Sequence, residues 1–294
     1  MRRRALRPLL LLLPFLLLMA VFLAGLGSGL LQSVGIVPAL GLTQPTPDYY
    51  LQILSSPQLW RSLGYSLYLS IVSSVLAVVL GVVLCSAMVL SGKVHGIAMR
   101  IIQLPILLPH VLVALLLMNL LSQSGLLARL CYHLGIIASQ EQFPGLIFDP
   151  YGIGILLAYL WKEIPFVAFF VITLMASVSE NLGEAARNLG ASPLQAFCRV
   201  TLPLSLPAIK NAFFIVLAFS FGAYELPFLL GPTSPKALPV AAYLEYISPD
   251  LKNRPVAMAM NGVMLLLSLG MAGLYYRLFQ ANVRRLRGGT ADER

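Results

Sequence analysis

The chain has 294 residues, of which 59% are hydrophobic and 11% are charged, and its mean hydropathy is +0.85. A soluble domain of this length has too little interior to cover so much apolar surface, so the composition excludes a soluble globular fold and indicates an integral membrane protein. The net charge of +9 does not indicate a nucleic-acid partner, because the basic residues lie beside the ends of apolar runs and the sequence holds no separate polar domain.

Six apolar runs are long enough to cross a membrane, since about 20 residues at about 1.5 Å each span the hydrocarbon core. The runs cover about residues 9–31, 62–90, 101–121, 151–176, 208–230 and 256–279. The first run follows a basic start and is long enough to be an uncleaved transmembrane helix, with a cleaved signal peptide as the alternative. The pattern predicts an all-α membrane protein with six transmembrane helices in one domain over residues 1–294.

Small residues and prolines predict local features of these helices. Serines and glycines are interleaved through the second run, which predicts that this helix faces protein. Pro105 and Pro109 stand near the start of the third run and are expected to bend it. Residues 122–150 form a loop that can carry a short helix of its own.

The lysines and arginines are divided unequally between the two sides of the membrane. Fourteen lie at the termini and in the loops near residues 95 and 190, five lie in the opposite loops, and Lys162 lies within a span. The first group is Arg2, Arg3, Arg4, Arg7, Lys93, Arg100, Arg187, Arg199, Lys210, Arg277, Arg284, Arg285, Arg287 and Arg294. Because basic residues favour the cytoplasmic side, both termini and the polar loop 178–207 are expected in the cytoplasm.

The loop 178–207 has a pattern of two short helices. Gly183 to Leu189 reads as one helix, and Gly190 suits the left-handed residue that ends it. Ser192 followed by Pro193 is typical of an N-cap and a first helical residue, which predicts a second helix through about Arg199. Two such helices are too polar to span the membrane and are expected to dock against a cytoplasmic partner. The alternative is an ordinary amphipathic loop on the membrane surface.

The same loop carries a spaced motif. Glu184-Ala185-Ala186, three residues, Gly190, nine residues and Val200-Thr201-Leu202-Pro203 resemble the EAA signature of permease subunits of binding-protein-dependent ABC importers. Val200 stands where the signature usually has isoleucine. The stretch Trp161 to Phe166 resembles the W-x-x-x-P-F segment of these permeases, and the resemblance covers about residues 60–280.

The resemblance implies a MetI-like fold in which the loop is a coupling helix that contacts an ATPase subunit. The residues implied in this contact are Glu184, Ala185, Ala186, Arg187, Gly190, Leu202 and Pro203. It also implies a second permease subunit, expected to be a different chain, two cytoplasmic ATPase subunits and an extracytoplasmic solute-binding protein, in a bacterial inner membrane. The sequence has no G-x-x-x-x-G-K-[ST] motif, so ATP and magnesium are expected on the partners, with no cofactor and no enzyme activity in this chain.

Charged residues within the spans are candidates for the solute path, because each costs at least ~2.5 kcal/mol when it faces lipid. Glu163 in the fourth run and Glu225 in the fifth, beside Tyr224, would suit a cationic solute. The structural alternative pairs Lys162 with Glu163, or each with another helix, and makes Glu225 a partner for backbone freed by Pro227.

His110 can be a proton relay, a ligand or a buried histidine with satisfied hydrogen bonds. The three cysteines, Cys85, Cys131 and Cys198, fall in different segments, which predicts neither a disulfide nor a metal site.

The segment Phe221 to Gly231 resembles the fifth helix of permeases in the polyamine, iron(III) and thiamine branch. It favours a small organic cation such as spermidine or putrescine, with a sugar, an organophosphonate, thiamine or iron(III) as alternatives. A secondary transporter is a further alternative, but it would not need the signature loop. An intramembrane hydrolase is disfavoured, since Lys162 has no demonstrable serine partner and no aspartate lies within a span.

Overall fold

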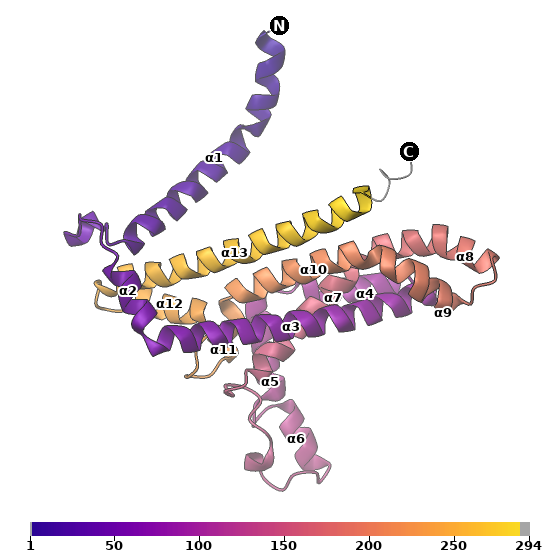
Figure 1. Cartoon of the computed structure of the whole chain (residues 1–294). Helices are drawn as coiled ribbons and strands as arrows, with labels where there is room; N and C mark the ends of the chain where they lie inside the picture. Colours follow the sequence, from indigo (N-terminus) through magenta and orange to yellow (C-terminus); the bar gives the residue numbers. More distant parts are fainter. Residues whose placement is uncertain (1, 289–294) are drawn as a thin grey trace. The chain divides into compact units, whose positions relative to one another are not determined.

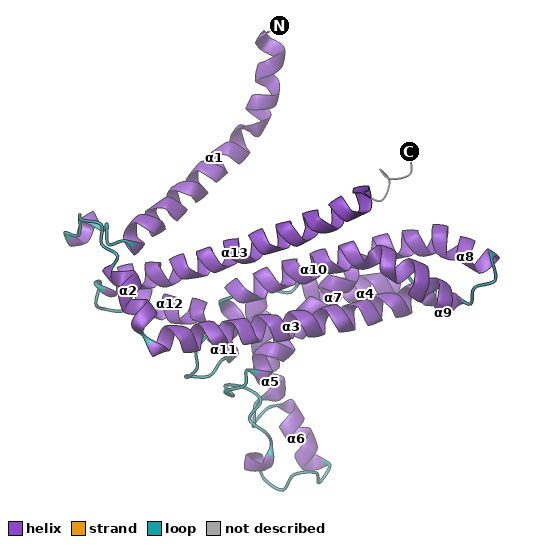
Figure 2. Ribbon diagram, in the orientation of Figure 1, coloured by secondary structure: helices purple, strands orange, loops and turns teal. Residues whose placement is uncertain are grey.

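The computed structural model describes residues 2–288, with side chains from residue 11 to residue 277. The described residues form helices joined by loops, and their only β-type pairing is an isolated bridge between Val37 and Leu42 (Figure 2). The basic residues predicted to set the topology at the two ends, Arg2, Arg3, Arg4, Arg7, Arg284, Arg285, Arg287 and Arg294, lie outside the described side chains.

Six helical stretches of the described chain are long and apolar enough to cross a membrane. They are Leu11–Ser33, Pro57–Leu90, His110–His133, Ile153–Asn188, Pro193–Gly222 and Asn253–Arg277. The prediction of an all-α protein with six candidate membrane helices is therefore confirmed.

Thirteen α-helices make up most of the described chain (Figure 1). They are α1 Arg2–Ser33, α2 Asp48–Ser55, α3 Pro57–Leu90, α4 Ile97–Leu107, α5 His110–Leu121, α6 Leu126–His133, α7 Ile153–Val178, α8 Glu184–Asn188, α9 Pro193–Ala196, α10 Leu202–Gly222, α11 Glu225–Leu230, α12 Leu238–Tyr246 and α13 Asn253–Gly288. Loop 122–150 carries a short helix, α6, as predicted, whereas α2 and α12 lie in connectors where no helix was predicted.

The chain separates into two compact units, one of residues 1–60 with 241–270 and one of residues 61–240 with 271–294. In the first, the Tyr50 hydroxyl donates to Ser33 Oγ at 2.9 Å and its ring lies against Gly262. Arg254 lies over the Tyr246 ring at 5.4 Å. The prediction of one permease domain remains a prediction.

The core of the second unit is built around α7. Its apolar residues Val167, Val171 and Met175 are fully buried and pack with residues of α3 and α10. Gly81 permits close approach of α3 to α7, because a Cβ there would lie 2.8 Å from Val167. Ser66, Ser70, Ser73 and Ser74 of α3 are also buried, which fits the prediction that this helix faces protein.

The third predicted helix is wrong as a single helix over 101–121. Leu108 has extended backbone (ψ 135°) and Pro109 cannot continue the hydrogen-bond ladder, so the chain breaks between α4 and α5. Pro105, the other proline expected to bend this run, lies inside α4 without ending it. The candidate span that replaces 101–121 is His110–His133, which includes α6.

The fifth predicted helix, 208–230, is also two helices. It begins earlier, at Leu202, because Pro203 fits the first turn of a helix, where its missing N–H costs no hydrogen bond. It ends at Gly222, where Ala223 takes extended backbone, and α11 starts at Glu225. Glu225 is therefore the first residue of a short helix rather than part of a continuous span.

Candidate functional site

The segment between α7 and α10, residues 178–207, is the first candidate site, and we call it the coupling segment. α7 runs into a single π-helical turn, Ser179–Gly183, and then directly into α8. After a turn, α9 runs through a second π-helical turn, Phe197–Thr201, into α10. Single π turns inside helices are often found at functional sites. Each short helix is thus a continuation of a long one.

The turn between α8 and α9 has the geometry that the sequence predicts. Gly190 has a φ of +91°, in the left-handed region that favours glycine. Ser192 caps α9: its side chain accepts from the Gln195 amide at 3.3 Å, and Gln195 Oε1 accepts from the Ser192 amide at 3.0 Å. Pro193 occupies the first helical position. The second helix is shorter than predicted, since its α-helical part ends at Ala196 and the π turn follows.

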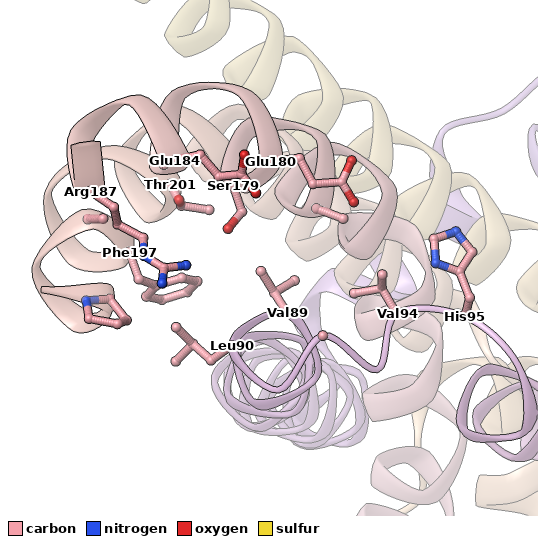
Figure 3. A pocket seen from close by; sticks show the side chains of 15 residues that line it. Val89, Leu90, Val94, His95, Ser179, Glu180, Glu184, Arg187, Phe197 and Thr201 are labelled. Atoms are coloured by element: carbon pink, nitrogen blue, oxygen red, sulfur yellow. The ribbon is translucent and has the colours of Figure 1, made fainter.

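The two π turns lie against each other. A Cβ on Gly183 would lie 3.3 Å from the buried hydroxyl of Thr201, so glycine lets the turns approach. A pocket of about 350 Å³ lies beside them, and Figure 3 shows Glu184 and Arg187 on one side of it and Val89 and Leu90 of α3 on the other. Two of the predicted coupling residues therefore share one pocket.

The outer surface of the coupling segment is apolar at its tip. Leu189 is 89% exposed and Leu194 is 63% exposed, while Ala196 and Phe197 are buried. Glu184, Ala185 and Arg187 are exposed and Ala186 is half-buried. Leu202 and Pro203 are the first residues of α10. Exposed leucines at a polar turn are a surface that a partner can cover.

The second candidate site lies where the two helix breaks meet, because His110 begins α5 and Glu225 begins α11. His110 Nδ1 lies 3.5 Å from Glu225 Oε2, and the His110 ring lies 5.4 Å from the ring of Phe219 on α10. Lys162 of α7 donates to the Leu108 carbonyl, within the first break, at 2.6 Å. Tyr224 stacks on Phe228 at 5.0 Å. Residues from four helices therefore meet at these breaks.

Glu163 lies deeper, on the buried side of α7. Its Oε1 accepts a hydrogen bond from Ser220 Oγ of α10. Ser73 of α3 faces the same carboxyl group, but its hydroxyl donates to the Ser70 carbonyl at 3.3 Å. Glu163 is 5% exposed, and its Oε2 has no hydrogen-bond partner among the described residues.

The charged residues within the spans have other partners than the sequence suggests. Lys162 and Glu163 have different partners and form no ion pair with each other within the described chain, so the pairing of these two residues is wrong. Pro227 stands in the first turn of α11, where it frees no backbone group for Glu225. Instead Glu225 faces His110, a contact that sequence reasoning missed. Both residues follow helix breaks, and the Pro109 break is the signal that indicated one of them.

No group of three or more His, Cys, Asp or Glu residues suited to a metal occurs in the part of the chain that the structure describes. All three cysteines are free thiols: Cys85 is buried, Cys131 is half-buried and Cys198 is exposed.

These features define a class: a multi-pass, all-helical membrane protein whose fourth and fifth spans are joined by two short helices, the second of them capped by Ser192. The chain belongs to the family described as "Binding-protein-dependent transport system inner membrane component", whose sequence profile matches residues 73–285. The recognition of a MetI-like permease from its signature is therefore confirmed.

Relatives differ in the solutes that their names give. The chain is 30% identical over 124 residues to a probable sulfate transport system permease of Anthoceros angustus, covering 42% of this chain and 40% of that one. It is 28% identical to a probable molybdenum ABC transporter permease of Haloferax volcanii, covering 59% of each. It is 32% identical to the spermidine/putrescine transport system permease of Escherichia coli, covering 38% of each. The chain thus spans 38–59% of the length of these relatives.

Solved structures show the same fold. The chain superposes on a bacterial ABC transporter involved in import of the acidic polysaccharide alginate with a TM-score of 0.73 at 21% identity, over 91% of this chain and 94% of that one. It superposes on an inward-facing MetNI methionine ABC transporter with a TM-score of 0.56 at 20% identity, over 77% and 98%.

Proposed function

We propose that this chain is a permease subunit of an ATP-driven importer, forming half of a translocation pathway for a small solute. The observation that carries the proposal is the coupling segment: two short helices, the second capped by Ser192, with exposed leucines at their tip and continuous with α7 and α10. A partner that moves this tip would move both long helices. Family membership supports the same assignment.

The partners follow from this assignment. ATP and magnesium belong to two ATPase subunits, one of which contacts Glu184, Ala185, Ala186, Arg187, Gly190, Leu202 and Pro203 of this chain. A second permease, of a different sequence, completes the pathway, and a solute-binding protein delivers the solute from outside. In a bacterial inner membrane, the coupling segment and both termini lie in the cytoplasm, as the distribution of basic residues favours.

Transport requires two conformations that bind the partners differently. When the ATPase subunits close on ATP, the tip at Leu189 moves with them and α7 and α10 turn together, because no flexible loop separates them from α8 and α9. Glu163, Tyr224 and Glu225 contact the solute on its way. The carboxylates of Glu163 and Glu225 favour a small organic cation, such as spermidine or putrescine, over the sugar, organophosphonate, thiamine and iron(III) alternatives.

Affinity purification of the tagged chain from its native membrane tests the proposal. A P-loop ATPase is expected to co-elute with the wild-type chain, and Leu189→Asp is expected to lower its yield about tenfold or more, since a buried charge would be desolvated at the contact. Leu134→Asp is the matched control, because Leu134 is a 66% exposed leucine at the end of α6, in a different loop. Co-elution of the ATPase with both variants at the wild-type yield would contradict the docking assignment.

A further inference from the structure

A pocket of about 220 Å³ lies between α4, α5, α7 and α10. Its walls are mostly apolar, with the rings of Phe166 and Phe219 among them, and its polar residues are His110, Lys162 and Glu163. Ligand sites of small molecules combine apolar walls with a few polar groups in this way, and they commonly measure about 300 Å³ or more. This pocket has room for a small molecule or for one end of a larger one.

Two of the three polar residues already have partners. Lys162 Nζ lies 2.6 Å from the Leu108 carbonyl, and His110 faces Glu225 at 3.5 Å. Glu163 differs, because one oxygen takes the Ser220 hydroxyl while the other has no hydrogen-bond partner among the described residues. No Lys, Arg or His nitrogen lies within 4.0 Å of its carboxylate in the described chain. A buried carboxyl oxygen without a partner is costly, so a ligand that supplies a donor is stabilised there.

We propose that this pocket, which we call the Glu163 pocket, binds the ammonium group of a solute with a short apolar chain. The inference rests on the proposed function, which favours an organic cation, and assigns the binding site of the cation's ammonium group. Glu163 Oε2 accepts one N–H, and the methylene groups lie against Phe166 and Phe219, whose ring faces also attract a cation. Lys162 also lines the pocket, but its ammonium group is bound to the Leu108 carbonyl, so a sulfate or molybdate ion would have to displace that carbonyl and would lie close to the Glu163 carboxylate. A polysaccharide unit would bring many hydroxyl groups to walls that offer them few partners.

Binding of radiolabelled putrescine to the purified transport complex tests the pocket. Glu163→Gln is expected to weaken binding about tenfold or more, because a charge-assisted hydrogen bond becomes a neutral one. Glu141→Gln is the matched control, since Glu141 is exposed in the loop 122–150, and its affinity is expected within about twofold of the wild type. Putrescine binding by Glu163→Gln within twofold of the wild type would overturn the proposal.

A second measurement uses the wild-type chain, so its result does not depend on whether the Glu163 variant folds. Dicyclohexylcarbodiimide modifies carboxyl groups in apolar surroundings, and mass spectrometry reports the modified fraction of Glu163. Putrescine is expected to reduce this fraction at least fivefold, whereas sodium sulfate and sucrose leave it unchanged. Equal modification with and without putrescine would contradict the proposal.

The two proposals can fail separately. ATPase co-elution is measured in the same preparation, and its absence contradicts the importer assignment whatever putrescine does. Protection of Glu163 is measured on the wild-type chain whether or not an ATPase co-elutes. If the ATPase is present and putrescine neither binds nor protects, the Glu163 pocket is wrong and the importer assignment stands.

Discussion

The coupling segment and the Glu163 pocket are built in opposite ways. Gly190, Ser192 and Pro193 act on the backbone within a few residues, so the turn between α8 and α9 is set locally. The Glu163 pocket joins residues far apart in the chain: Glu163 and Ser220 are 57 positions apart, and Lys162 and Leu108 are 54. A locally encoded element tolerates changes elsewhere, whereas an assembled pocket depends on the packing of every helix around it.

The largest effect that separates the two regions is expected from Gly190→Val. A β-branched residue at a φ of +91° is strained by about 1–2 kcal/mol, so the turn and the positions of α8 and α9 shift. Loss of ATPase co-elution and of transport is expected, with putrescine binding at the Glu163 pocket kept. Gly135→Val is the matched control, because Gly135 also has a positive φ (+70°) and open space around it, but follows α6. If Gly135→Val lowered ATPase co-elution equally, backbone strain anywhere in the chain would explain the loss, and the result would contradict a specific role of the turn between α8 and α9.

Lys162→Met is expected to have the next largest effect. It should destabilise the helices around the Glu163 pocket and leave the coupling segment unchanged. It leaves the Leu108 carbonyl without its charged donor, a loss of about 1.5–3 kcal/mol that lowers the midpoint of thermal unfolding in detergent. Lys210→Met, on the exposed side of α10, is expected to leave the midpoint unchanged. Equal midpoints for the Lys162 variant and the wild type would show that this hydrogen bond does not hold the α4–α5 break.

Removing the cap of α9 by Ser192→Ala is expected to cost about 1 kcal/mol. The change should stay local and appear as faster hydrogen exchange of the amides of residues 194–196, without faster exchange in α7. Ser192→Asp keeps a cap acceptor and is expected to restore slow exchange. Faster exchange throughout α7 and α10 after Ser192→Ala would contradict the local character of this segment.

The smallest effect is expected at the pair between His110 and Glu225. Glu225 has a half-exposed side chain, so the pair contributes under about 1 kcal/mol by a double-mutant cycle of His110→Gln and Glu225→Gln. The unfolding midpoints of the two single variants and the double variant give this coupling. A coupling of about 3 kcal/mol or more would contradict this expectation and would show that the contact between His110 and Glu225 is a main stabiliser of the two helix breaks.

The same contrast explains which features the sequence predicts. The number of membrane-length helices, the left-handed Gly190 and the Ser192 cap of α9 all follow from residues within a short window, and these predictions agree with the structure, whereas the bounds of the third and fifth runs do not. The break at Leu108 was anticipated only as a bend, because proline indicates a disturbance of the helix but not whether the chain resumes its direction.

The sequence does not predict the Glu163 pocket, and the reason is physical. The charge of Lys162 next to that of Glu163 suggested a pair, yet adjacent residues of a helix point about 100° apart and meet different neighbours. Ser220 becomes a partner of Glu163 only because α7 packs against α10, and the Leu108 carbonyl becomes a partner of Lys162 only because α7 packs against α4. A serine in an apolar run and a backbone carbonyl carry no sequence signal of such a role.

Photo-crosslinking at the tip of the coupling segment tests the central claim most directly. A benzophenone amino acid at position 189, where the native leucine is 89% exposed, is expected to form a covalent adduct with an ATPase subunit in native membranes. The same amino acid at position 134, after α6, is expected to give none. An adduct from position 134 and none from position 189 would contradict docking of the ATPase on this segment.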